Sequence, residues 1–170
     1  MAATPTAARA TAIEIDQMGE IVEHFLATGG TLGEMRGLNR QDFETLYSVA
    51  YHLFNQGKYD DAENIFKFLC FYNHLEKKNW MGLGSSRQMR KDFDGAIQAY
   101  SFLALLDVAN PYPPLHAGDC YLALGKLEEA ESGFFAAVHW AGDKPEYQAA
   151  RSRAEVLLRA VQTKREARHG

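Results

Sequence analysis

Residues 59–66 read Tyr-Asp-Asp-Ala-Glu-Asn-Ile-Phe, and the pattern of this stretch returns twice more at a spacing of 34 residues. The recurring positions are an alanine and, four residues later, an aromatic side chain: Ala62 and Phe66, Ala96 and Tyr100, Ala130 and Phe134. A fixed period of this length predicts stacked copies of one structural unit. Because stacked repeats present a long surface to another chain, the pattern favours a binding protein over an enzyme.

The copies fit one frame without insertions, at residues 43–76, 77–110 and 111–144. The eighth frame position is always small: Ala50, Gly84 and Gly118. Small residues here and at the recurring alanine let two helices approach to about 8 Å. Each copy is therefore predicted to be a hairpin of two helices, which makes the fold class all-α.

Helical periodicity and turn residues support the hairpins. A single helix face carries apolar residues at the helical spacing: Ala62, Ile65, Phe66, Leu69 and Cys70. Gly57 and Gly125 stand where the first helix of a copy must end, whereas the middle copy has Lys91 there and its turn is less well encoded. Residues 111–114, Pro-Tyr-Pro-Pro, fit a loop that leads into the first turn of a helix.

The pattern resembles the tetratricopeptide repeat over about 102 of the 170 residues. The middle copy carries the family positions at the family spacing: Trp80, Leu83, Gly84, Ala96 and Tyr100. The other copies depart from it, with Leu46 and Pro114 in place of the tryptophan and His74 in place of a closing proline. The resemblance implies a right-handed superhelix of three hairpins.

The flanking segments are expected to complete this stack. Residues 1–11 are predicted to be disordered, and residues 12–38 to form an N-terminal helical segment with an apolar stripe at Ile15, Met18, Val22 and Phe25. The repeats are then assigned to residues 39–144, and residues 145–170 to a capping helix with a basic tail. Two capping pairs are expected before the repeats, Thr31 with Glu34 and Asn39 with Asp42.

Composition excludes several classes of function. A net charge of −4 is unsuited to direct nucleic-acid binding, and no apolar run reaches the length of a membrane span. The two cysteines lie outside any CxxC motif, so neither a zinc site nor a disulfide is expected and the chain is interpreted as cytoplasmic. No metal, cofactor or catalytic group is predicted.

A stripe of aromatic residues on the first helix of the first copy is the main candidate site. Tyr47, Tyr51 and Phe54 follow one another at i, i+4 and i+7 and share one helix face. Other residues of that helix already supply its core face, so exposed aromatic side chains here favour a binding surface. The alternative is that the N-terminal helix folds over these rings and makes them part of the core.

The concave face formed by the first helices is predicted to continue this site. Its further candidates are His74, Met81, Ser85, Met89, Tyr112, His116 and Asp119. A lining of apolar sockets and a few polar groups suits an extended peptide that carries apolar anchors.

Several short segments resemble one family in particular, the class II chaperones of type III secretion translocators. They are residues 29–32, 54–63, 81–84 and 130–134, in the same order and spacing. The resemblance implies a cytosolic, non-enzymatic chaperone that keeps the major and minor pore-forming translocators in solution before export. It also implies that Tyr47, Tyr51 and Phe54 form the pockets for an extended translocator segment, with His74 at a groove position.

The same resemblance implies weak homodimers and, for some family members, assistance to an AraC-type transcription activator. It implies neither direct nucleic-acid binding nor membrane insertion. Two alternatives use the same fold: an adaptor for carboxylate-ended tails, and an assembly factor for a component of the secretion machine. The adaptor needs Lys, Asn and Arg in its groove, where this chain has Tyr47, Tyr51, Gly82, Tyr112 and His116.

Overall fold

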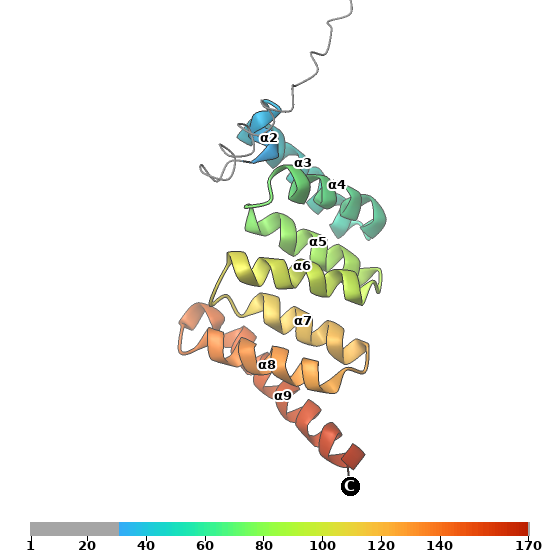
Figure 1. Ribbon diagram of the computed structural model, residues 1–170, viewed down its shortest axis with the longest axis vertical. Helices are drawn as coiled ribbons and strands as arrows, with labels where there is room; N and C mark the ends of the chain where they lie inside the picture. Colours follow the sequence, from blue (N-terminus) through green and yellow to red (C-terminus); the bar gives the residue numbers. More distant parts are fainter. Residues whose placement is uncertain (1–30, 170) are drawn as a thin grey trace, which may run out of the picture.

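The computed structural model describes residues 31–169, and all the regular structure in that range is helical (Figure 1). The segments predicted for residues 1–11 and 12–30 lie outside the described residues. The helices, in chain order, are α2 Leu32–Met35, α3 Arg40–Asn55, α4 Tyr59–Tyr72, α5 Lys77–Met89, α6 Phe93–Leu106, α7 Tyr112–Ala123, α8 Leu127–Ala141, the 3₁₀ turn η1 Pro145–Tyr147, and α9 Gln148–His169.

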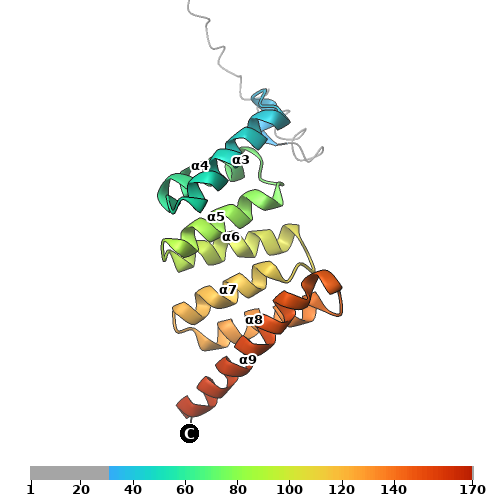
Figure 2. The same ribbon diagram turned by 180° about the vertical axis from the view of Figure 1, so that it is seen from behind.

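The helices α3 to α9 form one column in which each helix packs against the next (Figures 1 and 2). Three hairpins result, α3–α4, α5–α6 and α7–α8, and α9 packs on α8 and also touches α7. We call α3, α5 and α7 the first helices and α4, α6 and α8 the second helices. The expected all-α stack of three hairpins is confirmed.

Each hairpin closes on a small residue, as the 34-residue spacing predicts. The three recurring alanines have no exposed surface: Ala62, Ala96 and Ala130. A Cβ atom added to Gly84 would lie 2.5 Å from the ring of Tyr100, and one added to Gly118 would lie 2.6 Å from the ring of Phe134. Because carbon atoms do not approach so closely, a side chain at either glycine would push the two helices of its hairpin apart.

Both predicted capping boxes are present before the repeats. The Asn39 side chain accepts a hydrogen bond from the Asp42 amide at 3.1 Å, and the Asp42 carboxylate accepts one from the Asn39 amide at 2.9 Å. Thr31 and Glu34 make the same reciprocal pair at the start of α2. These bonds satisfy amides that have no partner within the helix and fix where α2 and α3 begin.

A buried carboxylate joins the first two hairpins. Glu63 of α4 is 2% exposed and binds Lys67 of its own helix at 2.6 Å, Arg87 of α5 at 3.2 Å, and Arg90 after α5. Burial raises the pKa of Glu63, but the hydrogen bonds from the three cations outweigh burial and hold the pKa below its usual value. The carboxylate therefore stays ionised and ties α4 to the end of α5.

The C-terminal helix α9 packs on the last hairpin of the stack. Its buried residues Ala150, Ala154 and Val161 pack on the core of the third hairpin. The predicted basic tail is part of this helix, because α9 runs to His169 and Arg165 pairs with Glu131 of α8. Within residues 31–169, no helix combines the length and hydropathy that crossing a membrane requires.

The turn of the middle hairpin holds a strained residue. Lys91 has a φ of 66°, and the equivalent residues of the other copies are Gly57 at 77° and Gly125 at 74°. This left-handed conformation costs an L-residue roughly 1–2 kcal/mol, whereas glycine adopts it freely. The middle copy thus keeps the turn of its neighbours without the residue that suits it.

We expect Lys91→Gly to increase the free energy of unfolding by about 0.5–1 kcal/mol, because the relief of strain exceeds the added freedom of the unfolded chain. Urea denaturation measures the change. Lys58→Gly is the matched control, since Lys58 is also an exposed turn lysine but has a φ of −83°. That variant should be less stable than the wild type, and a gain in both variants would contradict the strain at Lys91.

Candidate peptide-binding face

Within the aromatic stripe of α3, Tyr47 packs against the core and Tyr51 is exposed to solvent. The Tyr47 ring packs edge-on against Phe66 of α4, with centroids 5.8 Å apart and an interplanar angle of 69°. Its other neighbour is Tyr51, stacked at 6.2 Å and 13°. Tyr51 is 54% exposed, so its ring offers an apolar surface that is already fixed in orientation by Tyr47.

Phe54, the third residue of the stripe, is more buried than Tyr51. Its ring meets Tyr59 edge-on at 5.3 Å, and it packs against the core cluster of the first hairpin. Tyr47 and Phe54 are therefore half-buried supports, whereas Tyr51 is the accessible ring. Within the described residues Tyr51 is uncovered; the N-terminal segment that was predicted to be helical lies outside them.

A lysine that the sequence analysis did not select completes this part of the face. The Lys78 ammonium of α5 lies 4.4 Å from the centroid of the Tyr47 ring and 2.6 Å from the Glu44 carboxylate. Burial raises the pKa of Tyr47, so its hydroxyl remains protonated and able to donate. Glu44 and Lys78 occupy the same frame position in successive copies, and their opposite charges are the signal that could have revealed the pair.

On α5 the predicted polar residue is part of a network. The Ser85 hydroxyl lies 3.3 Å from the hydroxyl of Tyr100, which donates a hydrogen bond to the Gln88 side chain at 2.8 Å. Met81 packs against the core cluster of the second hairpin, and Met89 is 51% exposed at the end of the helix. This stretch thus combines an adaptable apolar side chain with polar groups whose positions are fixed.

On α7 the predicted histidine is enclosed by aromatic rings. His116 stacks on Tyr100 of α6 at 5.3 Å and on Tyr112 at 6.3 Å, and Tyr112 meets Tyr147 before α9 at 6.1 Å. Burial, assisted by the charge of Arg153, lowers the pKa of His116 to about 4. At neutral pH the ring is therefore uncharged and serves to pack the second hairpin against the third.

Asp119 is paired with the C-terminal helix. Its carboxylate accepts a hydrogen bond from Arg153 of α9 at 2.7 Å and lies 3.8 Å from His116. Burial raises the pKa of Asp119, while Arg153 opposes that effect. Arg153 was missed by the sequence analysis because a residue 34 positions further on reaches Asp119 only when α9 continues the repeat stack.

His74 lies in the turn between α4 and α5, at the junction of the first two hairpins. It lines a hollow of about 600 Å³ with Phe71, Trp80 and Phe102, and its carbonyl accepts a hydrogen bond from the Trp80 indole at 2.7 Å. This hollow contains none of the other nine predicted site residues. His74 thus marks the junction between the first two hairpins, where its carbonyl takes part in the turn.

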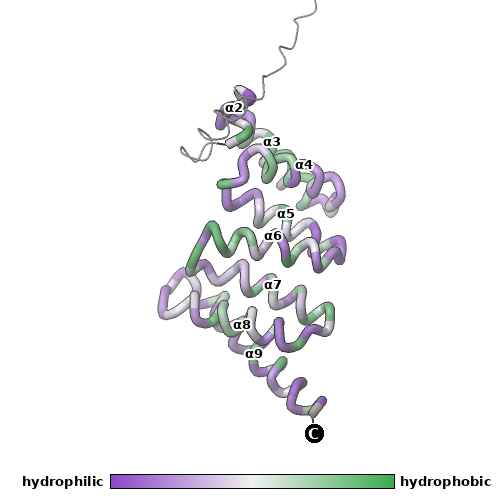
Figure 3. The backbone as a smooth tube through the Cα atoms, in the orientation of Figure 1, coloured by the Kyte–Doolittle hydropathy of each residue, from purple (hydrophilic) through white to green (hydrophobic). Residues whose placement is uncertain are grey.

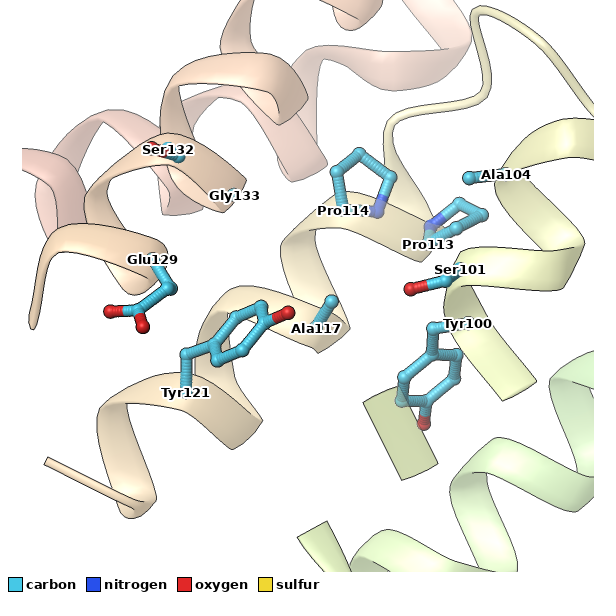
Figure 4. Close-up of a pocket in the computed structure, with 10 residues that line it drawn as sticks. All are labelled: Tyr100, Ser101, Ala104, Pro113, Pro114, Ala117, Tyr121, Glu129, Ser132 and Gly133. Atoms are coloured by element: carbon cyan, nitrogen blue, oxygen red, sulfur yellow. The ribbon is translucent and has the colours of Figure 1, made fainter. Parts of the chain in front are cut away.

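A second hollow repeats the first one hairpin further along. It measures about 350 Å³ and has Pro114, Ala117 and Tyr121 of α7 between Tyr100 of α6 and Gly133 of α8 (Figure 4). The α7 residues occupy the frame positions that Trp80, Leu83 and Arg87 occupy in the first hollow. Nearby, the C-terminal end of α6 is a hydrophobic stretch (Figure 3) that includes Leu105, which is 77% exposed.

Groups suited to catalysis are not gathered in the described part of the chain. No set of three or more His, Cys, Asp or Glu side chains in residues 31–169 could hold a metal ion. Burial raises the pKa of the Cys70 and Cys120 thiols to about 12, so both stay protonated at neutral pH. The face presents rings, methionines and fixed polar groups, and these suit contact with another molecule.

Comparison with known proteins identifies the family. The tetratricopeptide repeat profile matches residues 43–74 and 89–154. The low calcium response locus protein H of Yersinia pseudotuberculosis is 38% identical over 148 residues, which span 87% of this chain and 88% of the relative. The chain belongs to the family of type III secretion translocator chaperones.

Solved structures of these chaperones have the same fold. A type III secretion complex from Aeromonas hydrophila superposes with a TM-score of 0.83 at 39% identity and covers 86% of this chain and 98% of the other. The Yersinia enterocolitica chaperone SycD, in complex with a peptide of the translocator YopD, gives a TM-score of 0.72 at 38% identity over 75% and 98% of the two chains. The family expected from the sequence is confirmed.

We expect the stability of the protein to fall as the pH is lowered from about 6.5 to about 4, in part because of His116. In this range the unfolded imidazole takes up a proton that the buried folded ring excludes, so protonation favours the unfolded state. Urea denaturation across this range measures the effect. His116→Gln should weaken the pH dependence, and equal pH dependence in wild type and His116→Gln would contradict the buried neutral ring.

Proposed function

We propose that this chain is a chaperone that holds an extended segment of a type III secretion translocator against the face formed by its first helices. The observation that carries the proposal is the open Tyr51 ring, held in place by Tyr47, in a fold shared with a chaperone solved in complex with a translocator peptide. The ten residues predicted from the sequence remain the proposed site, with Lys78 added and with His74 and His116 in supporting positions.

The face offers two kinds of contact to an extended segment. Tyr51 and Met89 present apolar surface, and burial of one aliphatic anchor against them stabilises a complex by roughly 1.5–3 kcal/mol. Lys78, Ser85 and Gln88 can bond the carbonyl and amide groups of an extended backbone. Two or three anchors then support micromolar affinity after the costs of association, which allows release.

Such binding solves a problem of pore-forming translocators. Their apolar segments must insert into a target membrane, yet would aggregate in the cell that makes them. Masking these segments against the first helices in the cytoplasm keeps the translocators competent for secretion. The chaperone performs no chemistry in this role, in keeping with a face that contains rings and polar supports.

Two further properties are carried over from the family as proposals. A weak homodimer is one, and a related chaperone, SycD, has a structure described as an alternative dimer. Assistance to an AraC-type activator is the other. That role is tested by pull-down of such an activator with the cargo-free chaperone, and an activator that fails to bind would remove it.

We expect Tyr51→Asp to weaken binding of a fluorescent translocator peptide by roughly 10–100-fold, because the variant removes an apolar anchor that is exposed before binding. Fluorescence anisotropy measures the affinity and circular dichroism the helical content. Because Tyr51 is more than half exposed, its replacement should leave the melting temperature close to that of the wild type. Tyr47 and Phe54 are less suitable, since changes there also disturb the core.

Phe135→Asp is the matched control, because Phe135 is 63% exposed but lies on α8, away from the first-helix face. This variant should bind the peptide as the wild type does. Equal loss in both variants, or no loss in Tyr51→Asp, would reject the first-helix face as the binding site. Co-expression with the translocator tests the activity itself: the translocator should be recovered in the soluble fraction only with the chaperone present.

A further inference from the structure

One side of α3 is exposed although the same side of α5 and of α7 is buried. At the third, seventh and tenth frame positions the second and third repeats have side chains that are at most 9% exposed: Asn79, Leu83 and Ser86 on α5, and Pro113, Ala117 and Cys120 on α7. The equivalent residues of α3 are Thr45, Val49 and His52. All three are exposed, Val49 to 46%.

The preceding second helix is what buries this side in the later repeats. A Cβ atom added to Gly82 of α5 would lie 2.3 Å from the Phe66 ring of α4, and His116 of α7 stacks on Tyr100 of α6. Gly82 and His116 both hold the sixth frame position. Its counterpart on α3, Ser48, is exposed and donates its hydroxyl hydrogen bond to a carbonyl of its own helix.

The exposed side of α3 is hollowed to a volume of about 460 Å³. Among the described residues, those that line the hollow all belong to α3: Gln41, Glu44, Thr45, Ser48, Val49, His52 and Leu53. The hollows between successive hairpins, in contrast, are lined by three helices each. The described part of the chain therefore supplies one wall of this site, and a helix laid on α3 would supply the other.

We propose that residues 12–27 of this same chain form that helix and dock on the exposed side of α3. The segment has 16 residues, close to the 14 of α4 and of α6, which occupy the corresponding place in the later repeats. Its apolar residues Ile15, Met18, Val22 and Phe25 fall at i, i+3, i+7 and i+10, so a helix would present them on one side.

Residue 31, the first that the structure describes, lies beside the N-terminal end of α3, which is where the docked helix has to end. Thr31 lines a small hollow together with Arg40 and Phe43 in the first turn of α3, and Gly33 is packed tightly against the Phe43 ring. A second helix ends near the start of the first helix that follows it, as α4 does before α5. The segment is thus tethered where its C-terminal end has to lie.

The short tether favours this chain over a second copy as the source of the helix. Only residues 28–30, Thr-Gly-Gly, separate the segment from Thr31. A short flexible linker gives an effective concentration in the millimolar range, which exceeds the concentration of a second copy in dilute solution.

The docked helix would leave the candidate peptide-binding stripe free. Successive residues of an α-helix are rotated by about 100° around its axis. On this basis the centre of the exposed side, at the third, sixth, seventh and tenth frame positions, lies roughly 140° around α3 from the centre of the stripe of Tyr47, Tyr51 and Phe54. In this arrangement the N-terminal helix does not fold over the aromatic rings, which was the alternative considered from the sequence. The N-terminal segment caps α3 from the side, and a bound peptide can occupy the aromatic stripe at the same time.

The test combines Val22→Asp, Val49→Asp and the double variant in the full-length chain. A charge on either side of the proposed contact should undock the helix, so each single variant should speed amide hydrogen exchange in α3 by about tenfold or more. The double variant should show no further increase. Val156→Asp is the matched control, because Val156 is 65% exposed on α9 and should leave exchange in α3 unchanged.

Sedimentation at dilute and at high protein concentration identifies the source of the helix. The proposal requires the Val22 effect in the monomer. An effect that appears only where dimers sediment would assign the docked helix to a second copy, and would overturn the proposal. Wild-type exchange in Val22→Asp would overturn it too; Val22 lies outside the repeats, so its replacement leaves their cores intact.

Discussion

The whole stack depends on the contact between a large ring on each second helix and a residue with almost no side chain on its first helix. Gly84 lies under Tyr100 and Gly118 under Phe134, with no room for a further carbon atom. This contact sets how closely the two helices of a hairpin approach. Because the next hairpin packs on the same rings, the contact also sets how far apart successive first helices lie. The arrangement of the proposed binding face is a consequence of this spacing.

The sequence revealed the parts of the fold that depend on local pattern. The 34-residue spacing, the capping boxes and the apolar face of α9 each follow from residues close together in the chain, so hairpins and helix starts could be predicted. The binding face was less accessible, since its geometry depends on contacts across the stack. Lys78 over Tyr47 and Arg153 on Asp119 join residues about one repeat apart, and the stacking of His116 on Tyr100 joins two different hairpins.

One helix serves three purposes on three sides. The core side of α3 closes the first hairpin through Ala50, the stripe with Tyr51 is proposed to meet the cargo, and the side with Val49 is proposed to receive the N-terminal segment. The end of a repeat array normally turns a polar side to water, and the side of α3 with Val49 is mixed, since Thr45, Ser48 and His52 share it. At the other end, α9 meets that expectation with a polar outer surface and a paired Arg165.

The buried Glu63 has a consequence for how the molecule unfolds. Solenoids tend to open one unit at a time, since each unit touches only its neighbours. Removal of α5 from α4 would break the ion pairs of Glu63 with Arg87 and Arg90 and leave only Lys67 of its own helix as a partner. These ion pairs therefore couple the opening of the second hairpin to that of the first.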